Sequence, residues 1–235
     1  MKRFYKAVEI APEESGWRVL LDGRGIKTAA GKPQVVPARA LAEALAAEWA
    51  GQGEEIAASA FHFRDLTDYA IDMAGPERTV VIAAVLRFAE TDTLCYRAEP
   101  DAPLHQRQLA VWEPLLTAAE RRWDVHFTRI DGVIHRPQPA ATLARMQAAL
   151  AAEDPFTLAA LHTLASLAAS LVIALAATAR GADAETLWNA ANLEEDWQAE
   201  LWGWDADAEA LRARRLGEFA AAMRFANLAR EVVPR

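Results

Sequence analysis

The spacing of apolar residues divides the chain into an early part with the pattern of strands and a longer part with the pattern of helices. Before residue 37, short apolar runs alternate with turn residues, and strands are expected over residues 4–10, 17–21, 26–28 and 34–36. Asp22–Gly23 supplies the turn of a hairpin. Because so small a sheet buries little apolar surface alone, one of its faces should pack against helices.

After Pro37 the apolar residues recur at helical spacing. Leu41, Leu45 and Trp49 lie on one face of a helix that ends near Gly51. Further helices are predicted over residues 66–73, 77–90, 104–124, 140–152, 184–201 and 205–229. We also expect a minor hairpin formed by residues 125–127 and 132–134. The fold class is therefore α+β, with a small β-rich module and first helix over residues 1–60 and a larger, mainly α-helical module over residues 61–235.

One apolar run, residues 156–179, has no formal charge and is long enough to span a bilayer. However, it contains His162 and several hydroxyl side chains, much of its apolar content is alanine, and no aromatic belt flanks it. We interpret it as a buried central helix, or two helices with a break, and expect no membrane insertion.

Composition narrows the classes of partner. The formal net charge of −8 argues against a nucleic-acid partner, which needs a basic surface, and is compatible with a basic protein partner. The lone Cys95 excludes an internal disulfide and fits a reducing compartment. The first residues lack a signal-peptide core and a transit segment, so we expect a bacterial cytoplasmic protein rather than one imported into the mitochondrial matrix.

The run from Leu193 to Gly203 combines two residue types that seldom occur together. It places four carboxylates among large indole rings at positions 197, 202 and 204; the carboxylates are Glu194, Glu195, Asp196 and Glu200. One interpretation is a solvated helix whose carboxylates pair with the arginines at 212, 214 and 215. The other is a surface that holds a partner, with a stripe formed by Leu193, Trp197 and Leu201.

The residues give little support to catalysis or metal binding. Adjacent carboxylates on a helix diverge by about 100° each, so they do not converge on one substrate. The five histidines lack the spacing of a zinc site, and no phosphate-binding loop or nucleophile elbow is present. We expect Cys95 and His162 to be core residues. No catalytic residue, metal or cofactor is predicted, although an enzyme using the carboxylates of residues 194–200 in a cleft between the modules remains the alternative; raised carboxyl pKa values would favour it.

A second unusual run, Glu90 to Arg97, and the aromatic Trp49 have mainly structural interpretations. Glu90, Asp92 and Arg97 are expected to cap a helix end and form an ion pair. Trp49 is expected to be a core aromatic that anchors the first helix on the sheet and so supports the shape of a binding surface.

Together the two runs resemble the assembly chaperone of the F1-ATPase alpha subunit, the family often called ATP-twelve. The resemblance extends over almost the whole chain, to Arg3–Lys6, Leu21–Arg24 with Ile26–Thr28, Glu48–Trp49, Arg107–Gln108 and Trp112–Leu116. It departs at residues 61–66, where a Met-Pro-type turn is expected and Phe-His-Phe-Arg-Asp-Leu stands instead.

The resemblance implies a non-enzymatic chaperone whose partner is the F1-ATPase alpha subunit and whose functional acidic residue is Glu194. An unassembled subunit exposes an apolar patch, which a chaperone covers with an apolar surface rimmed by polar groups. The predicted partner-binding residues are Glu194, Glu195, Asp196, Trp197, Glu200 and Trp202. Trp49, Asp92 and Arg97 are predicted to support this site.

Overall fold

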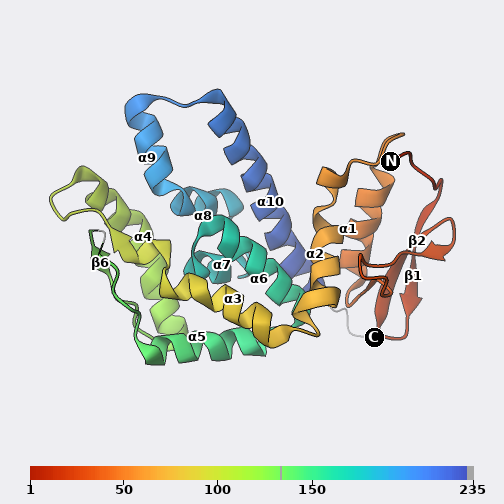
Figure 1. Cartoon of the computed structure of the whole chain (residues 1–235), viewed down its shortest axis with the longest axis horizontal. Helices are drawn as coiled ribbons and strands as arrows, with labels where there is room; N and C mark the ends of the chain where they lie inside the picture. The colour runs from red at the N-terminus through yellow and green to blue at the C-terminus, as the bar shows by residue number, and fades with distance from the viewer. Residues whose placement is uncertain (133, 232–235) are drawn as a thin grey trace. The chain divides into compact units, whose positions relative to one another are not determined.

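The computed structural model describes residues 1–132 and 134–231 and divides into two compact units that are interleaved along the sequence. The first unit contains Met1–Arg78, Asp154–Ala160 and the end of the chain from Ala221. The second contains Thr79–Glu153 and Leu161–Ala220. A small N-terminal sheet followed by mostly helical structure confirms the predicted α+β class (Figure 1). The module boundary at residue 60 stays a prediction.

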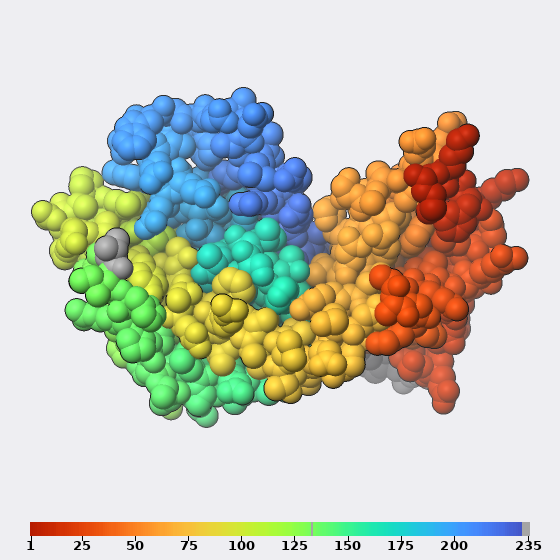
Figure 2. Space-filling model, in the orientation of Figure 1, coloured from red at the N-terminus to blue at the C-terminus, as the bar shows by residue number. Residues whose placement is uncertain are grey.

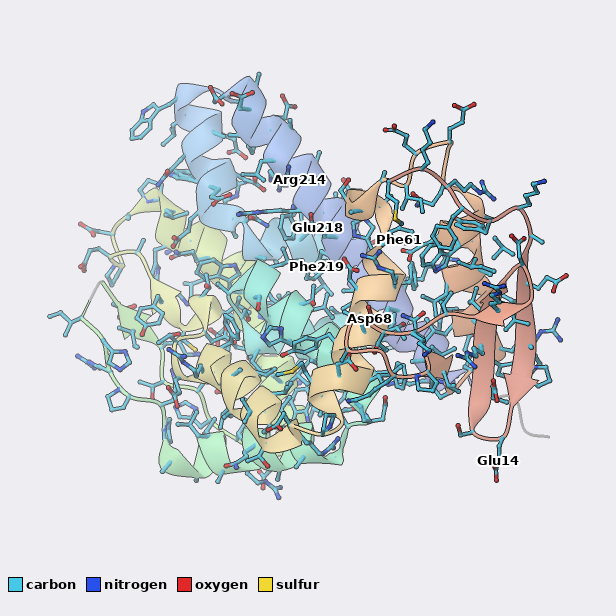
Figure 3. The ribbon with its side chains drawn as sticks, turned by 45° about the vertical axis from the view of Figure 1, so that its right-hand side comes forward. Glu14, Phe61, Asp68, Arg214, Glu218 and Phe219 are labelled. Carbon is cyan, nitrogen blue, oxygen red and sulfur yellow. The ribbon has the colours of Figure 1, made fainter. Side chains whose placement is uncertain are left out.

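The sheet of the first unit is centred on strand β2, Gly16–Leu21. It pairs antiparallel with β1, Val8–Glu13, and also with the short strands β3, Arg24–Gly25, and β4, Val35–Val36. Glu14 lies at the tip of the β1–β2 hairpin (Figure 3). Gly16 is required where β4 meets this hairpin, because a Cβ there would lie 2.1 Å from the carbonyl oxygen of Val36.

Helix α1, Arg39–Ala50, packs on this sheet through the apolar face predicted from its spacing. Leu41 and Leu45 are buried, and so is Trp49, whose ring contacts those of Tyr5 and Phe61 at centroid distances of 5.5 and 4.6 Å. The Tyr5 hydroxyl donates to the Trp49 carbonyl at 2.6 Å. The prediction that Trp49 is a core aromatic is confirmed.

Residues 61–66, where the expected Met-Pro-type turn is replaced, form the start of α2, His62–Tyr69. A short 3₁₀ turn, Ala58–Ala60, precedes this helix and a π-helical turn, Ala70–Ala74, follows it. Helix α2 begins four residues before the predicted position, because the Glu48 carboxylate accepts the N–H groups of Phe63 and Arg64 at 2.7 and 3.0 Å. Burial raises the pKa of Glu48. Phe63 also contacts Phe225 at 6.1 Å within the same unit.

The second unit is built around α4, Pro103–Trp123. Trp112 of α4 is fully buried and its indole N–H donates to the Ala190 carbonyl at 2.7 Å. Trp188 and Phe219, with ring centroids 5.6 Å apart, extend this core. Helices of this unit include α3, Arg78–Glu90; α5, Ala140–Ala152; α7, Leu171–Ala177; α8, Ala184–Ala191; α9, Leu193–Trp202; and most of α10, Ala206–Arg230.

The long apolar run forms two helices, α6, Pro155–Ala168, and α7, as one of the two predicted alternatives stated. The break falls at Ala169, which has a φ of 47°, and at Ser170, whose side chain accepts the N–H of Ile173 at 3.0 Å. Across the described residues, no helix is both long enough and apolar enough to cross a membrane.

Two local predictions are wrong. Residues 125–127 form no strand; instead β6, Ile130–Asp131, pairs in parallel with β5, Tyr96–Arg97. The Arg129 guanidinium binds the carboxylates of Glu113 and Glu120 on α4, which places residues 125–130 along that helix rather than in a hairpin. Val133, in the second predicted strand, lies outside the described residues. The helix predicted over 184–201 is divided at Asn192, whose φ and ψ of −105° and 20° are not helical.

Candidate functional site

Helix α9 carries the acidic, tryptophan-rich run, and its exposure increases along its length. Leu193 is buried and Trp197 is half-buried, but Leu201 is 58 % exposed. The predicted apolar stripe therefore joins the core only at its first residue. The helix ends at Gly203, whose φ of 91° favours glycine.

The carboxylates of this run have separate partners. Glu194 Oε1 accepts from Gln108 Nε2 at 2.7 Å. Asp196 pairs with Arg212 of α10 at 2.7 Å, and both side chains are largely buried. Glu200 accepts two hydrogen bonds from Arg107, at 2.5 and 2.7 Å, and this ion pair lowers the pKa of Glu200. A lowered pKa is the opposite of what a general acid needs.

Of the three arginines expected to pair with this run, only Arg212 is seen to do so. Arg214 lies 3.8 Å from Glu218 of its own helix, a pair visible in Figure 3. Arg215 lines a hollow between α9 and α10. The arginine that binds Glu200 comes instead from α4, and its guanidinium also lies 5.6 Å from the centre of the Trp197 ring.

Gln108 of α4 links the two runs that the sequence singles out. It is fully buried, and its side-chain oxygen accepts the Ala98 N–H at 2.8 Å while its amide donates to Glu194. The backbone carbonyl of Gln108 accepts a hydrogen bond from the Arg97 guanidinium at 3.3 Å. The sequence interpretation used Arg107 and Gln108 only as part of the family resemblance. No local pattern could have identified their contacts with α9, because Arg107 and Gln108 lie 93 and 86 residues from Glu200 and Glu194 in the sequence.

Asp92 and Arg97 are both buried, and the two predicted interactions, a helix cap and an ion pair, are both present. Asp92 accepts the N–H groups of Leu94 and Val172 at 3.1 and 2.9 Å, so it caps the start of α7 as well as its own turn. Burial raises the pKa of Asp92 to about 6. Arg97 forms its ion pair with Glu113 at 3.1 Å, not with Asp92, and lies over the Trp112 ring.

Cys95 lies between these two residues in the sequence and is buried, as predicted. Burial raises the pKa of its thiol to about 12, so it is not a reactive thiolate near neutral pH. His162 is half-buried, and burial lowers its pKa. Among the described residues, no group of three or more metal-ligating side chains is assembled.

The turn between α9 and α10 exposes large apolar side chains. Trp202 is 83 % exposed and Trp204 is 45 % exposed. We call residues 193–205 the tryptophan arm; Figure 2 shows α9 and the start of α10 at the surface of the second unit. Behind the arm lies a hollow of about 380 Å³ whose lining includes Trp188, Glu195 and Arg212. The indole N–H of Trp188 and Nε of Arg212 are buried and have no acceptor among the described residues.

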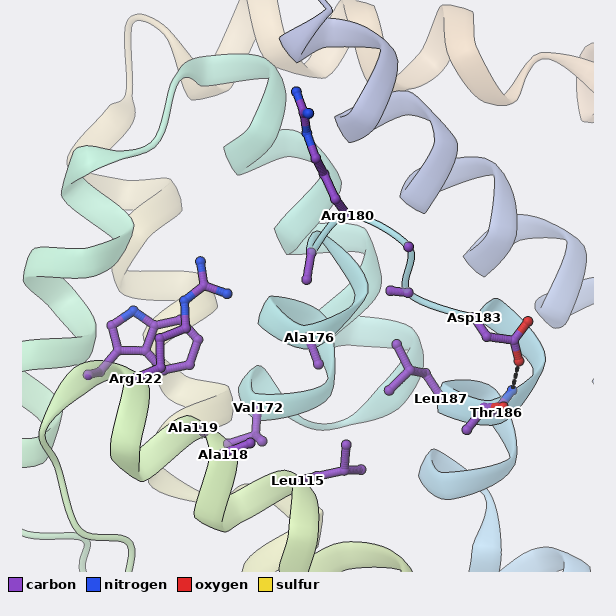
Figure 4. Close-up of a pocket in the computed structure, with 14 residues that line it drawn as sticks. Leu115, Ala118, Ala119, Arg122, Val172, Ala176, Arg180, Asp183, Thr186 and Leu187 are labelled. Carbon is purple, nitrogen blue, oxygen red and sulfur yellow. Dashed lines mark hydrogen bonds between the residues drawn. The ribbon is translucent and has the colours of Figure 1, made fainter.

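A second hollow of about 380 Å³ in this unit lies between α4, α7 and α8 (Figure 4). Its walls are mainly alanine and leucine, and Arg122 and Arg180 lie at its edge. Asp183 there is a helix cap, because its side chain accepts the N–H of Thr186 at 2.8 Å. This hollow contains none of the predicted site residues.

The carboxylates of the arm do not converge on one point, whereas two of its three indoles, those of Trp202 and Trp204, are exposed to solvent. Exposed apolar side chains beside carboxylates that do not converge are typical of proteins that bind another protein through a surface. A model of the ATP12 chaperone protein family matches residues 2–120, slightly more than half of the chain. The chain belongs to this family, whose chaperones serve the assembly of ATP synthase, and it is not an enzyme.

Relatives agree with this assignment. The crystal structure of Atp12 from Paracoccus denitrificans superimposes with a TM-score of 0.91 at 37% identity, covering 97% of this chain and 98% of that one. The structure of an aspartate-to-lysine mutant of P. denitrificans Atp12p gives the same values. The mitochondrial atp12 protein of Schizosaccharomyces pombe is 26% identical over 219 residues, which are 88% of this chain and 75% of that protein.

Proposed function

We propose that this chain holds the unassembled alpha subunit of F1-ATPase, in the bacterial cytoplasm, until that subunit joins the beta subunit. The tryptophan arm is the proposed contact surface. It would cover an apolar patch that the free alpha subunit exposes and that would otherwise cause aggregation.

The observation that supports this proposal best is the exposure of Leu201, Trp202 and Trp204 next to one another at one turn. Tryptophan is enriched among the residues that dominate protein–protein binding free energies, because its ring buries a large area when a partner covers it. These three side chains lie beside acidic residues, so an apolar patch with a basic rim is the matching surface.

The ion pairs within the arm indicate which of its carboxylates are available to contact the partner. Asp196 and Glu200 are each neutralised by an arginine, and so contribute less to the field outside the arm. Glu195 is exposed and forms no ion pair within the described part of the chain. Among the residues that the structure describes, Glu194 has only the neutral amide of Gln108 as a side-chain partner. We therefore infer that Glu194 and Glu195 supply the acidic rim, while Trp197 and the paired carboxylates position the arm.

The test is suppression of alpha-subunit aggregation after dilution from denaturant, followed by light scattering. Trp202→Ser should melt like the wild type, because the ring is exposed, yet bind the alpha subunit about tenfold more weakly. Val80→Ser is the matched control, since Val80 is 59 % exposed on another helix of the same unit. Equal protection by wild type and Trp202→Ser would contradict the proposed contact surface.

A further inference from the structure

Four sequence segments of the first unit converge on one groove that the tryptophan arm does not explain. The groove has a volume of about 520 Å³. Its lining comes from residues 4–5, 21–22, 24–27 and 49. A volume of this size is in the range of sites that bind a discrete group.

The floor of the groove is apolar and made of packed side chains. Tyr5, Leu21, Ile26 and Trp49 are all buried, and the Tyr5 and Trp49 rings meet edge to face. Phe4 stands beside them and is 63 % exposed. An apolar side chain bound here would cover the Phe4 ring and the floor together.

The edge of the groove is basic. Arg24 and Lys27 are exposed, and within the described residues neither forms an ion pair. The Asp22 carboxylate, which also lines the groove, accepts the backbone N–H groups of Lys6 and Ala7 at 3.0 and 2.8 Å. Asp22 is close enough to Arg24 to attract it, so the lining of the groove carries two cations and one carboxylate and is basic on balance.

This basic edge contrasts with the rest of the chain. Residues 1–37 contain seven basic and four acidic side chains, whereas the whole chain has 25 and 33. All four lysines lie at positions 2, 6, 27 and 32. An acidic partner would therefore be attracted to this part of an otherwise acidic protein.

Trp49 adds a hydrogen-bond donor without an acceptor. Its indole N–H is buried and has no partner among the described residues. A buried unpaired donor costs free energy. Trp49 and Lys27 also line an adjoining hollow whose wall carries Asp65, Asp68 and Asp72, and these carboxylates would repel an acidic segment. An acidic occupant is therefore confined to the side of Arg24.

We propose that this groove is a second docking site, for a segment of the alpha subunit that carries a carboxylate next to a bulky apolar side chain. The inference rests on the proposed function, because the alpha subunit is the partner assumed. The carboxylate would face Arg24 and Lys27, and the apolar side chain would lie on Phe4 and the floor.

Because all four lysines lie within the first 32 residues, their side-chain amines can serve as probes of this groove and its surroundings in the intact chain. Amine acetylation is followed at each lysine by mass spectrometry, with and without saturating alpha subunit. Acetylation of Lys27 should slow several-fold in the complex, while acetylation of Lys2 and Lys32 should not. Lys32 is a suitable internal reference because it already pairs with Asp72 at 3.5 Å.

Two variants test the same contact through affinity. Arg24→Glu with Lys27→Glu should bind the alpha subunit about tenfold more weakly, and its binding should depend less on salt concentration than that of the wild type. Lys2→Glu with Arg39→Glu makes the same change of charge on exposed residues of this unit and should bind like the wild type. Phe4→Ala should also weaken binding, and Phe4→Leu should restore part of it.

The outcomes separate this inference from the proposed function. If the wild type does not bind the alpha subunit, the proposed function fails. If the wild type binds but the Arg24/Lys27 variant binds equally well and Lys27 stays reactive, only the second site is refuted. Acetylation of Lys27 could instead slow with millimolar ADP or inorganic phosphate and stay unchanged with the alpha subunit. That result would identify a small-anion site and overturn the proposal.

Discussion

Gln108 and Glu194, 86 residues apart in the sequence, form a hydrogen bond of 2.7 Å between a buried amide and an exposed carboxylate. The same amide group accepts the Ala98 N–H through its oxygen. Gln108 therefore fixes α9 to the segment that follows β5, and Glu194 is at once the first acidic residue of the tryptophan arm and the point where the arm is attached.

Glu194→Lys should show whether Glu194 serves mainly to attach α9 to Gln108 or mainly to bind the alpha subunit. The ammonium group would face the donor side of the Gln108 amide, so we expect the free energy of unfolding to fall by about 1 kcal/mol. Binding to the alpha subunit should weaken by more than tenfold, since the charge at an interface is reversed. Thermal unfolding and an aggregation assay measure the two effects.

Glu194→Gln keeps an acceptor for Gln108 and removes only the charge, so it shows whether charge or shape matters. Glu185→Lys, an exposed change on α8, is the matched control. If Glu194→Lys folds and still protects the alpha subunit, Glu195 or Glu200 becomes the next candidate.

Gln108→Ala should destabilise the second unit more than any exposed substitution on α9. The change leaves the Ala98 N–H without its acceptor and opens a cavity beside Trp112, so we expect a loss of about 2–3 kcal/mol. Chemical denaturation measures it. An unfolding free energy equal to that of the wild type would show that water replaces the amide without cost.

Asp92 should make stability depend on pH. Its pKa is raised to about 6 from 3.8, so between these values the folded state binds a proton that the unfolded state has lost. The Asp92 contribution is therefore most favourable below about pH 4, decreases as pH rises, and levels off above about pH 6. The change is on the order of 3 kcal/mol.

Asp92→Asn should remove this dependence while losing one of the two accepted N–H bonds. The difference in unfolding free energy between wild type and variant should shrink or change sign as pH rises from 4 to 7. A difference that stays constant over this range would mean that Asp92 is ionised at both ends.

Trp49→Arg should reduce soluble yield. The change places an unpaired charge between Tyr5 and Phe61, and burying such a charge costs several kcal/mol, comparable with the stability of a domain. Trp49→Phe is the control, because it keeps an aromatic ring in the same place and should cost less. A wild-type melting temperature for Trp49→Arg would refute this account of the core.

Local pattern by itself determined the early sheet, the helical remainder, the buried face of α1 and the possibility of a break in the apolar run. These features depend on residues within a few positions of one another, where period and turn chemistry act directly. The prediction from local pattern was wrong at residues 125–134, because β6 pairs with β5, which lies more than 30 residues away in the sequence. Side chains such as Arg129 also hold the segment before β6 on α4.

The tertiary structure alone decided the partners of the charged residues. The sequence indicated that carboxylates and tryptophans share residues 193–204, but not that Arg107 takes Glu200, that Gln108 takes Glu194, or that Arg97 takes Glu113 rather than Asp92. A long polar side chain can reach many partners, and only the packing of α4 against α9 selects one of them. The exposure of Trp202 was set in the same way, since it depends on where α9 leaves the core.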